Sequence, residues 1–392
     1  MRIVGITAEY NPFHQGHAFH LDSARRITGA DYVIVAMSGN YVQRGVPAMF
    51  DKYTRSKAAL LNGADLILEL PPCIATGSAE HFASGAVNLF TKTRIVTDLC
   101  FGSECGDLTP LIQVADILAE EPDAWRHALQ ESLRLGNPWP KACRQALSSY
   151  GEEIPFGLLD TPNNLLGVEY LKALSRQNSP VRPHTVLRKG SSYHETVLED
   201  DSPASAGAIR QALLKSRGHF TSDTRMQIPS LEVYKDYDGK PPITENAFSL
   251  LLLERLQRDP EESFGLYFNV GTDLANRIRN CLDQFTSFSQ FTDLIKTRNL
   301  TRTAVSRALL HILLNIRKYE AADCFRVLGF RRRAVPLLKE LANRGTLPLV
   351  TSPGDRILSK DWLYADRLYE SVRSLLHEQP FQNERLRKML VL

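Results

Sequence analysis

Two histidines, His14 and His17, stand three residues apart near the start of the chain, with Gly16 between them. Residues 2–7 have the composition of a buried parallel strand, and residues 20–26 have that of a helix. Two histidines at this spacing can share one face at the start of a helix, where unpaired backbone N–H groups favour a phosphate. A glycine there lets the backbone approach closely. The order strand, turn, HxGH, helix therefore indicates nucleotide chemistry.

An alternative is that the two histidines are only a helix cap and a core residue, but the position after a first strand favours the nucleotide site. The arrangement resembles the HxGH nucleotidyltransferases, and this resemblance implies that both histidines stabilise the transition state at an α-phosphate. A second, looser match spans residues 202–210, which stand in the place of a serine-containing segment of those enzymes and include Ser205. Alanine and glycine at positions 206 and 207 depart from the polar residues that are usual there.

The composition indicates a soluble globular protein. The chain has 392 residues, of which 43% are hydrophobic and 23% are charged, and its length favours two domains. The sequence has no apolar run of membrane-spanning length and no signal-peptide pattern, so we expect a cytoplasmic protein with no membrane partner. Six cysteines without a CxxC pair predict neither a zinc site nor a disulfide framework, and no protein ligands for a metal are identified.

The fold class follows from the alternation of elements. Apolar segments at residues 32–37, 66–70 and 96–101 follow the first strand and alternate with helical patterns. This alternation predicts an α/β fold with a parallel sheet and crossover helices. We therefore expect a Rossmann-like nucleotidyltransferase domain over residues 1–217, with a helical insertion at about 108–150. Ligands of such sheets bind at the carboxyl ends of the strands.

Three further residues are predicted to line the nucleotide site because each ends a strand or opens a helix. Gly102 permits close approach of a ribose or base, Asn163 offers a donor and an acceptor, and Arg188 offers a fork to phosphate. Local helix capping is an equal alternative for Asn163. The loop at 38–48 and the helix start that follows it carry Arg44, Lys52 and Arg55, which could meet a polyphosphate; the alternative is ordinary surface charge.

The second half of the chain differs in pattern and charge. Residues 218–244 contain a cluster of prolines, aspartates and a glycine and are predicted to be a linker. Residues 245–392 are predicted to form an all-helical domain, because their apolar residues recur at spacings of three and four. The domain is predicted to be basic, because residues 216–392 have a net charge of +6 and the preceding residues −3. Three arginines at 331–333 follow Phe330, an arrangement that suits an unstacked base and a backbone phosphate. Pairing with neighbouring acidic residues is the alternative.

Nearly the whole chain resembles the tRNA(Met) cytidine acetate ligase family. The resemblance is carried by residues 5–14, 38–45, 101–104, 162–164 and 301–307 and by Asp51 and Lys52. It implies that ATP and acetate form acetyl-adenylate, and that the acetyl group passes to the exocyclic amine of the wobble cytidine of elongator tRNA(Met), giving N4-acetylcytidine. Mg²⁺ is expected to accompany ATP. The oligomeric state stays open.

These arguments together predict three sets of site residues. The catalytic set is His14, His17 and Lys52. The ATP-binding set is Thr7, Ala8, Glu9, Tyr10, Asn11, Pro12, Phe13, His14, Gln15, Gly16, His17, His20, Gly102, Asn163, Arg188 and Ser205. The substrate-binding set is Ser38, Gly39, Asn40, Gln43, Arg44, Arg302, Arg307, Arg331, Arg332 and Arg333.

Two other functions use the same features. A small-molecule adenylyltransferase, or a ligase of pantothenate-synthetase type, would share the first domain but use no RNA, and the basic second half argues against it. A nucleotide-sensing RNA-binding protein would have no turnover, and the intact pair His14 and His17 argues against that.

Overall fold

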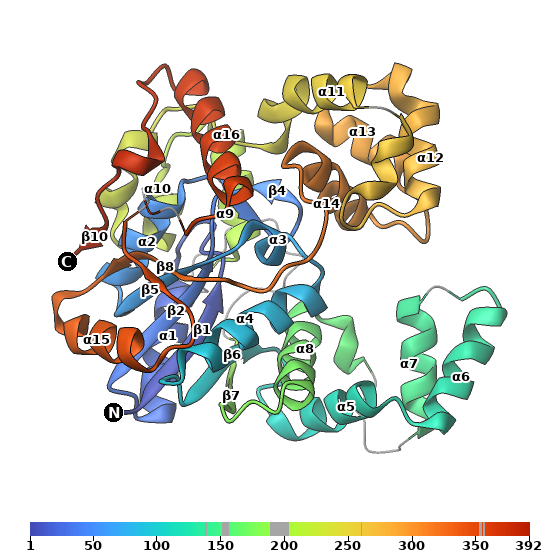
Figure 1. Ribbon diagram of the computed structural model, residues 1–392, viewed down its shortest axis with the longest axis horizontal. Coiled ribbons are helices and arrows are strands. Elements are labelled where there is room, and N and C mark those ends of the chain that lie inside the picture. The colour runs from blue at the N-terminus through green and yellow to red at the C-terminus, as the bar shows by residue number, and fades with distance from the viewer. Residues whose placement is uncertain (138, 151–156, 189–203, 260, 353–354, 356) are drawn as a thin grey trace.

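A computed structural model describes residues 1–137, 139–150, 157–188, 204–259, 261–352, 355 and 357–392 (Figure 1). Within these residues the main sheet has eight strands, in the spatial order β10-β8-β5-β2-β1-β6-β7, and β9 pairs with β8. These strands are β1 (Ile3–Ala8), β2 (Tyr32–Ser38), β5 (Leu66–Leu70), β6 (Asp98–Ser103), β7 (Arg182–Leu187), β8 (Phe325–Phe330), β9 (Leu349–Val350) and β10 (Leu390–Val391). A two-stranded ribbon joins β3 (Tyr41–Val42) and β4 (Val46–Pro47).

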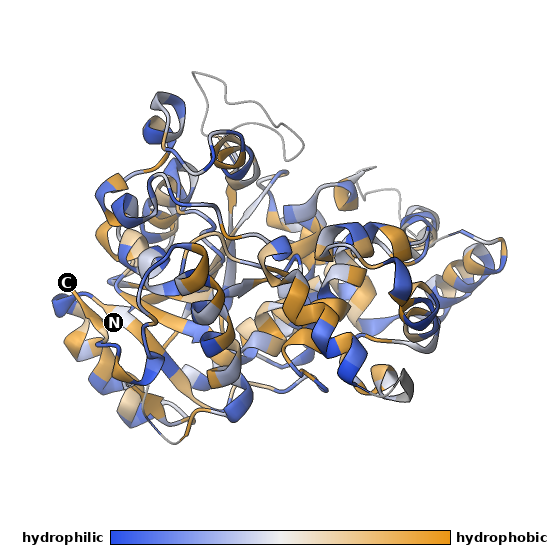
Figure 2. Ribbon diagram, turned by 90° about the horizontal axis from the view of Figure 1, so that it is seen from above, coloured by the Kyte–Doolittle hydropathy of each residue, from blue (hydrophilic) through white to orange (hydrophobic). Residues whose placement is uncertain are grey.

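The central strands are apolar because both faces of the sheet are covered. In β2, Val33 and Val35 face one hydrophobic core, whereas Ile34 and Ala36 face a second core on the other side. Neighbouring strands β7, β6, β1, β2 and β5 are all parallel. Strands buried on both faces read as continuous hydrophobic runs, and Figure 2 shows these runs along the sheet. The predicted α/β class with a mostly parallel sheet is confirmed.

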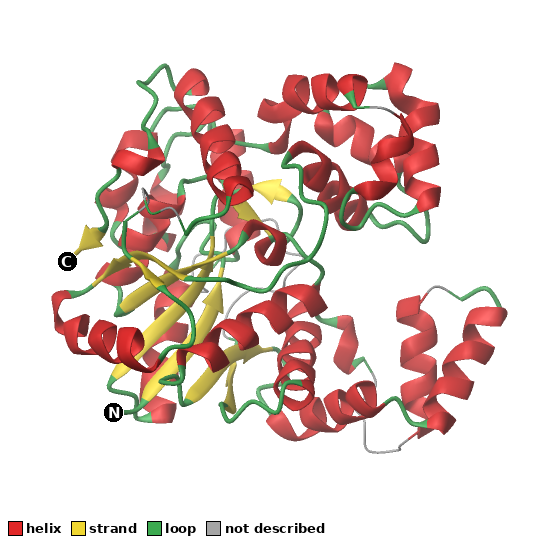
Figure 3. Ribbon diagram, in the orientation of Figure 1, coloured by secondary structure: helices red, strands yellow, loops and turns green. Residues whose placement is uncertain are grey.

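Helices cover both faces of the sheet (Figure 3). The first core is covered by α1 (Gln15–Thr28), α2 (Lys52–Leu61) and α9 (Ala206–Lys215). The second core is covered by α4 (Ala79–Thr93), α8 (Pro162–Arg176) and α15 (Val335–Arg344). Short α3 (Pro72–Ala75) precedes α4, and the segment expected to be a helical insertion forms α5 (Leu108–Glu120), α6 (Asp123–Arg134) and α7 (Trp139–Tyr150). Helices α6 and α7 lie away from the sheet (Figure 1).

The second half is helical only in part. A helical module, defined here as the four helices α11 (Ser249–Arg258), α12 (Thr272–Cys281), α13 (Phe288–Ile295) and α14 (Arg302–Leu313), forms a separate group in Figure 1. After α14 the chain returns to the sheet as β8, which pairs antiparallel with β5, and then adds β9, α16 (Lys360–Leu376) and β10. The expectation of an all-helical domain over 245–392 is therefore corrected. All six residues of β8 are buried, which explains its apolar sequence.

The segment at 218–244 packs against the body of the protein. It contains α10 (Ser222–Gln227) and a 3₁₀ segment, η2 (Leu231–Tyr237), in which Tyr234 and Tyr237 are buried. The Tyr237 hydroxyl donates to Asp51 at the start of α2, over 2.7 Å. The remaining 3₁₀ segments are η1 (Leu158–Asp160), η3 (Glu245–Phe248), η4 (Glu261–Leu266), η5 (Leu282–Gln284), η6 (Arg332–Ala334) and η7 (Glu384–Leu386). None of the described helices combines the length and apolar character needed to cross a membrane.

An ionic cluster ties the C-terminal segments to the sheet. Lys52 Nζ lies 3.1 Å from Glu69, 2.7 Å from Asp366 and 2.9 Å from Glu384. Arg326, in β8, pairs with the same three carboxylates and completes the cluster. Lys52 is fully buried. A charge in this position is stabilised only by its partners, so its loss leaves carboxylates buried with too little compensation.

We expect Lys52→Ala to lower the free energy of unfolding by about 3–5 kcal/mol, because removal of one partner from a buried ion pair leaves the other charges uncompensated. The measurement is urea denaturation followed by circular dichroism. Lys57→Ala is the matched control, since Lys57 lies on the same helix but is exposed, and its effect should stay within about 0.5 kcal/mol. Equal, small losses in both variants would contradict a stabilising role for the ionic cluster.

Candidate functional site

A cavity of about 530 Å³ opens at the carboxyl edge of the parallel sheet. Its walls come from the ends of β1, β6 and β7 and from the first turns of α1, α8 and α9. Such a volume is typical of small-molecule sites. The predicted residues that line it are Thr7, Ala8, Glu9, Tyr10, Asn11, His14, Gly16, His17, His20, Gln43, Arg44, Gly102, Asn163, Arg188 and Ser205.

The first turn of α1 is closed by its own histidines. The Gly16 backbone N–H donates to His14 Nδ1 over 3.1 Å, and the His14 backbone N–H donates to His17 Nδ1 over 3.2 Å. This reciprocal arrangement is a capping box with histidine in both side-chain roles. Because each Nδ1 accepts, each neutral ring carries its hydrogen on Nε2. Two N–H donors are therefore available beside the N-terminus of a helix.

Removal from water keeps these histidines neutral. Burial, with Arg188 and Arg210 nearby, lowers the pKa of His14 to about 3, and burial and Arg188 lower the pKa of His20 to about 4. Burial and the neighbouring His14 hold the pKa of His17 well below its ordinary value. At neutral pH the histidines donate hydrogen bonds as imidazoles, and the positive charge at the cavity comes from arginines.

Two polar atoms near the cavity are buried and have no hydrogen-bond partner among the described residues: Tyr10 OH and His20 Nε2. Both residues line the cavity. A buried polar group without a partner is unfavourable, and such groups are rare unless a ligand or water completes them. The site is therefore suited to a polar ligand with several oxygen and nitrogen atoms, as ATP has.

A second polar group surrounds the start of α8. Glu104 accepts from Asn163 Nδ2 over 2.6 Å and from the backbone N–H of Asn164 over 2.8 Å, so its carboxylate caps this helix. Arg188 Nη1 donates to Asn163 Oδ1 over 3.2 Å. A side chain at Gly102 would place its Cβ 3.2 Å from Arg188 Cγ, so glycine leaves room for this arginine. The three residues predicted from separate segments thus lie together.

Comparison with known proteins identifies the family. The family model described as HIGH Nucleotidyl Transferase matches residues 1–387. The tRNA(Met) cytidine acetate ligase of Acetivibrio thermocellus is 35% identical, over 99% of this chain and 97% of that protein. The enzyme of that name from Halothermothrix orenii is 38% identical, over 90% of this chain and 87% of that protein. This chain belongs to the tRNA(Met) cytidine acetate ligase family.

Solved structures agree with this assignment. Thermotoga maritima TmcAL in its apo form is 29% identical and covers 100% of both chains, with a TM-score of 0.89. A structure of the same protein bound with alpha-thio ATP also covers 100% of both chains, with a TM-score of 0.85. A similarity over both entire chains includes the helical module and the C-terminal strands as well as the nucleotidyltransferase sheet.

In this member of the tRNA(Met) cytidine acetate ligase family, four predicted residues belong to the protein interior. Ser38 and Asn40 are buried, and Asn40 Nδ2 donates to Asp366 of the ionic cluster over 3.2 Å. Gly39 lies so close to Glu69 that a Cβ there would clash with its carboxylate. Lys52 is occupied by three carboxylates and does not line the cavity, so its predicted catalytic position is corrected to a buried, structural one.

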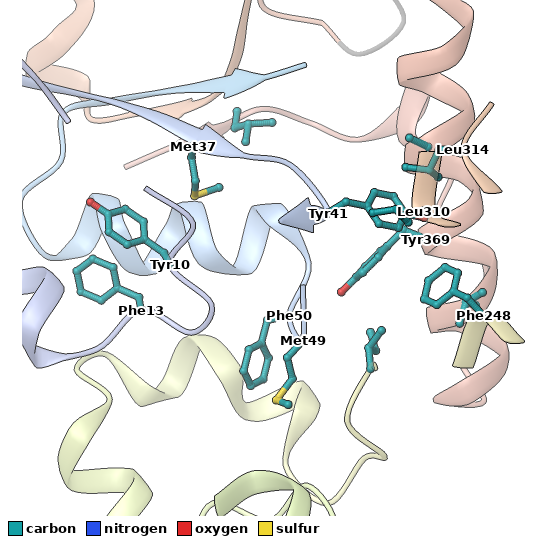
Figure 4. Packing of buried hydrophobic residues seen from close by; sticks show 14 of the residues in the cluster. Tyr10, Phe13, Met37, Tyr41, Met49, Phe50, Phe248, Leu310, Leu314 and Tyr369 are labelled. Carbon is teal, nitrogen blue, oxygen red and sulfur yellow. The ribbon is translucent and has the colours of Figure 1, made fainter. Parts of the chain in front are cut away.

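Three residues of the HxGH turn also face away from the cavity. Pro12 and Phe13 are buried, and the Phe13 ring packs 4.9 Å from that of Tyr10, centroid to centroid (Figure 4). Gln15 is exposed and donates to the carbonyl of Met226. Their contribution to the site is the support of the turn, because they are not among the residues that line the cavity.

Arg331, Arg332 and Arg333 lie at the opposite edge of the sheet. Strand β8 runs antiparallel to β5, so its last residue pairs with Leu66 at the start of β5. Arg333 Nε lies 3.1 Å from Asp65 Oδ1, which is the acidic pairing considered as the alternative from the sequence. The pair with Asp65 accounts for Arg333, and tRNA binding by the three arginines, on a surface away from ATP and acetate, stays a prediction.

Helix α14 reaches the rim of the cavity. Ser306 Oγ donates to the carbonyl of Gly45 over 2.9 Å, and a side chain at Gly45 would meet the α14 backbone at Arg307. Gly45 ends the short turn that carries Gln43 and Arg44, both of which line the cavity. Arg307 is half-buried at this contact, whereas Arg302 is exposed and lies 3.5 Å from Glu245. Arg307 is therefore nearer than Arg302 to the contact between α14 and Gly45.

The sequence did not predict one arginine of the site, nor the aromatic wall, which is a group of three aromatic side chains that line the cavity. Arg210 lines the cavity and its Nη1 donates to the carbonyl of Asn11 over 2.7 Å; it ends the 202–210 segment, which was a usable signal. Residues 202 and 203 of that segment lie outside the described residues. Phe82, Phe101 and Tyr170 also line the cavity, and the last two rings are 5.6 Å apart. No pattern distinguished these aromatics from ordinary core residues.

We expect the protein to lose stability as the pH falls from 7 to 5. The unfolded chain binds protons at histidines near pH 6.5 whereas His20 in the folded protein stays neutral to about pH 4, so the unfolded state is favoured as the pH falls. His20→Gln should reduce the loss by up to about 2 kcal/mol, measured by urea denaturation at both pH values. His127→Gln, at an exposed histidine, is the control and should keep the wild-type loss.

Proposed function

We propose that this protein is an ATP-dependent tRNA(Met) cytidine acetate ligase that acts in the cytoplasm. It activates acetate as acetyl-adenylate and then acetylates the exocyclic amine of the wobble cytidine of elongator tRNA(Met). The observation that carries the proposal is the pair of neutral histidines at the N-terminus of α1, beside a cavity of nucleotide size, in a chain of this family.

The first step joins acetate to the α-phosphate of ATP. A carboxylate oxygen of acetate attacks the α-phosphorus, the bond to the β-phosphate oxygen breaks, and pyrophosphate leaves. Negative charge builds on the phosphoryl oxygens in the transition state. His14 Nε2–H, His17 Nε2–H and the backbone N–H groups of α1 can stabilise that charge without a proton transfer. Arg188 and Arg210 at the cavity favour the leaving pyrophosphate.

We expect Mg²⁺ to enter with ATP. The described residues contain no group of three histidine, cysteine, aspartate or glutamate side chains able to hold a metal ion. A hard cation at this site would therefore be held mainly by phosphate oxygens and water, as is usual for Mg²⁺ with nucleotides. When bound, it would neutralise phosphate charge. Among the residues that the structure describes, the carboxylates that line the cavity are those of Glu9 and Glu104, and they accept hydrogen bonds from Gln43 and from the start of α8.

The second step transfers the acetyl group. The exocyclic amine of cytidine attacks the acetyl carbonyl carbon, AMP leaves with the bonding electrons of the anhydride oxygen, and the amine loses a proton. The cytidine must therefore reach the acetyl group through the open side of the cavity. Gln43 and Arg44 line the cavity next to α14 of the helical module, and the side chain of Arg44 is exposed. We infer that tRNA approaches along this rim.

A small-molecule adenylyltransferase is the alternative that the cavity alone would allow. One experiment separates the two functions: ATP–pyrophosphate exchange measured with and without acetate, followed by transfer of labelled acetate to a tRNA(Met) transcript. Exchange that depends on acetate, followed by transfer to tRNA, supports the ligase. Exchange with another acid only, and no transfer to RNA, would refute it.

We expect His17→Ala to reduce acetate-dependent exchange by a hundredfold or more while ATP affinity changes by less than about tenfold. A donor directed at charge that develops in the transition state affects the transition state more than the bound substrate. Exchange rates and ATP affinity by calorimetry are measured on the same preparation. Gln15→Ala is the control, because Gln15 lies in the same helical turn but is exposed and outside the lining. Unchanged exchange in His17→Ala would contradict the assignment.

We expect the double variant Arg44→Ala/Arg307→Ala to bind tRNA more weakly, with a flatter dependence on salt. Each lost phosphate contact removes about one unit from the slope of log affinity against log salt concentration. Filter binding at several salt concentrations measures this slope. The triple variant with alanine at positions 331, 332 and 333 is the comparison: it breaks the pair with Asp65 and should lose thermal stability but keep its slope. The reverse pattern would place tRNA at the opposite edge.

A further inference from the structure

Arg55, in α2, is a fully buried cation that the mechanism above does not use. Its side chain is 0% exposed, and it is not among the residues that line the cavity. Within the described part of the chain, the guanidinium donates to four backbone carbonyls: Nε to Phe50 over 2.9 Å, Nη1 to Glu9 and to Ser38, and Nη2 to Gly39. One side chain thus joins the ends of β1 and β2 to the start of α2.

Among the described residues, Arg55 forms no ion pair. Burial lowers the pKa of its guanidinium, and the nearby charges of Asp51 and Glu9 offset this only in part. A buried cation without a paired anion is unfavourable, and an apolar side chain of similar volume would fill the space at lower cost. The hydrogen bonds to carbonyls compensate for its burial. Arginine therefore serves here to hold these carbonyls in a fixed geometry.

The carbonyl of Glu9 lies directly before a residue with an unfavourable backbone conformation. The next residue, Tyr10, has a φ of 50°, in the left-handed region that is unfavourable for a bulky residue. Tyr10 lines the cavity, and its ring packs 4.8 Å from that of His17. Within the described residues, Arg55 is the only group that donates to the Glu9 carbonyl. The turn after Tyr10 is held by different donors: Arg210 donates to the Asn11 carbonyl, and the Met49 N–H donates to the Asn11 side chain.

We propose that Arg55 is a positioning residue for adenylate formation. By holding the Glu9 carbonyl against the end of β2, it keeps Tyr10, His14 and His17 in the geometry that the transition state at the α-phosphate requires. The inference rests on the proposed function, since it concerns acetate-dependent chemistry in the same cavity. Displacements of about 1 Å at catalytic groups can lower a rate about a hundredfold.

The test compares Arg55→Met and Arg55→Lys with the wild type in acetate-dependent exchange. We expect Arg55→Met to lower kcat by about a hundredfold and to change KM for ATP by less than about fivefold, because substrate binding is shared by many groups. Arg55→Lys keeps the charge but not the planar fork, so it should lower kcat by about tenfold. If Arg55→Met does not fold, the kcat of Arg55→Lys alone tests the positioning role.

Arg373→Met is the matched control for destabilisation alone. Arg373 is also buried, at 4% exposure, but it pairs with Glu370 within α16 and not with the turns of the site. This variant should lose thermal stability and keep kcat within about twofold at a temperature below its melting point. Wild-type kcat in the Arg55 variants, or a loss borne only by KM, would overturn the positioning role. Absence of exchange in the wild type would instead refute the proposed function.

Discussion

The hydrogen bonds that His14 and His17 accept at Nδ1, from the backbone N–H groups of Gly16 and His14 respectively, determine what this site can do. They use the Nδ1 atom of each ring, so Nε2 of each ring is left as a donor. They also complete the first turn of the helix, whose remaining N–H groups add to the same positive potential. Because burial keeps both rings neutral, donation does not depend on a proton that is lost near neutral pH.

The rest of the fold places other polar and charged groups beside the N-terminus of α1. The parallel strands β1, β6 and β7 end at one edge, and this brings together the start of α1, Gly102 and the start of α8. Arginines supply the charge that the histidines lack, and their charge is independent of pH in the physiological range. The aromatic wall of Phe82, Phe101 and Tyr170 excludes water from one side, which strengthens these electrostatic interactions.

The two halves of the chain form one connected structure. The hydrophobic core that contains Tyr10 and Phe13 continues through Tyr41 and Tyr369 to Leu310 of α14 (Figure 4). The ionic cluster adds a polar connection between α2, the sheet and α16. The helical module is fixed against the turn at Gly45, next to Gln43 and Arg44 of the cavity lining.

The sequence by itself determined the features that arise from short stretches of chain. The strand before the HxGH turn, the helix after it, the parallel class of the sheet and the helices between 249 and 313 follow from local periodicity and turn chemistry, which depend on residues close together in the chain. The strand-end candidates Gly102, Asn163 and Arg188 were predicted because parallel strands share one carboxyl edge.

Only the tertiary structure decided which charges meet. Lys52 has the sequence context of a phosphate ligand, yet its ammonium is held by Asp366 and Glu384, which are distant in the chain. The direction of β8 placed Arg333 at the edge away from the cavity, because antiparallel pairing with β5 reverses the order of residues along the sheet. Charge pairs depend on distances between segments that no local pattern encodes, and the same is true of the four carbonyls that surround Arg55.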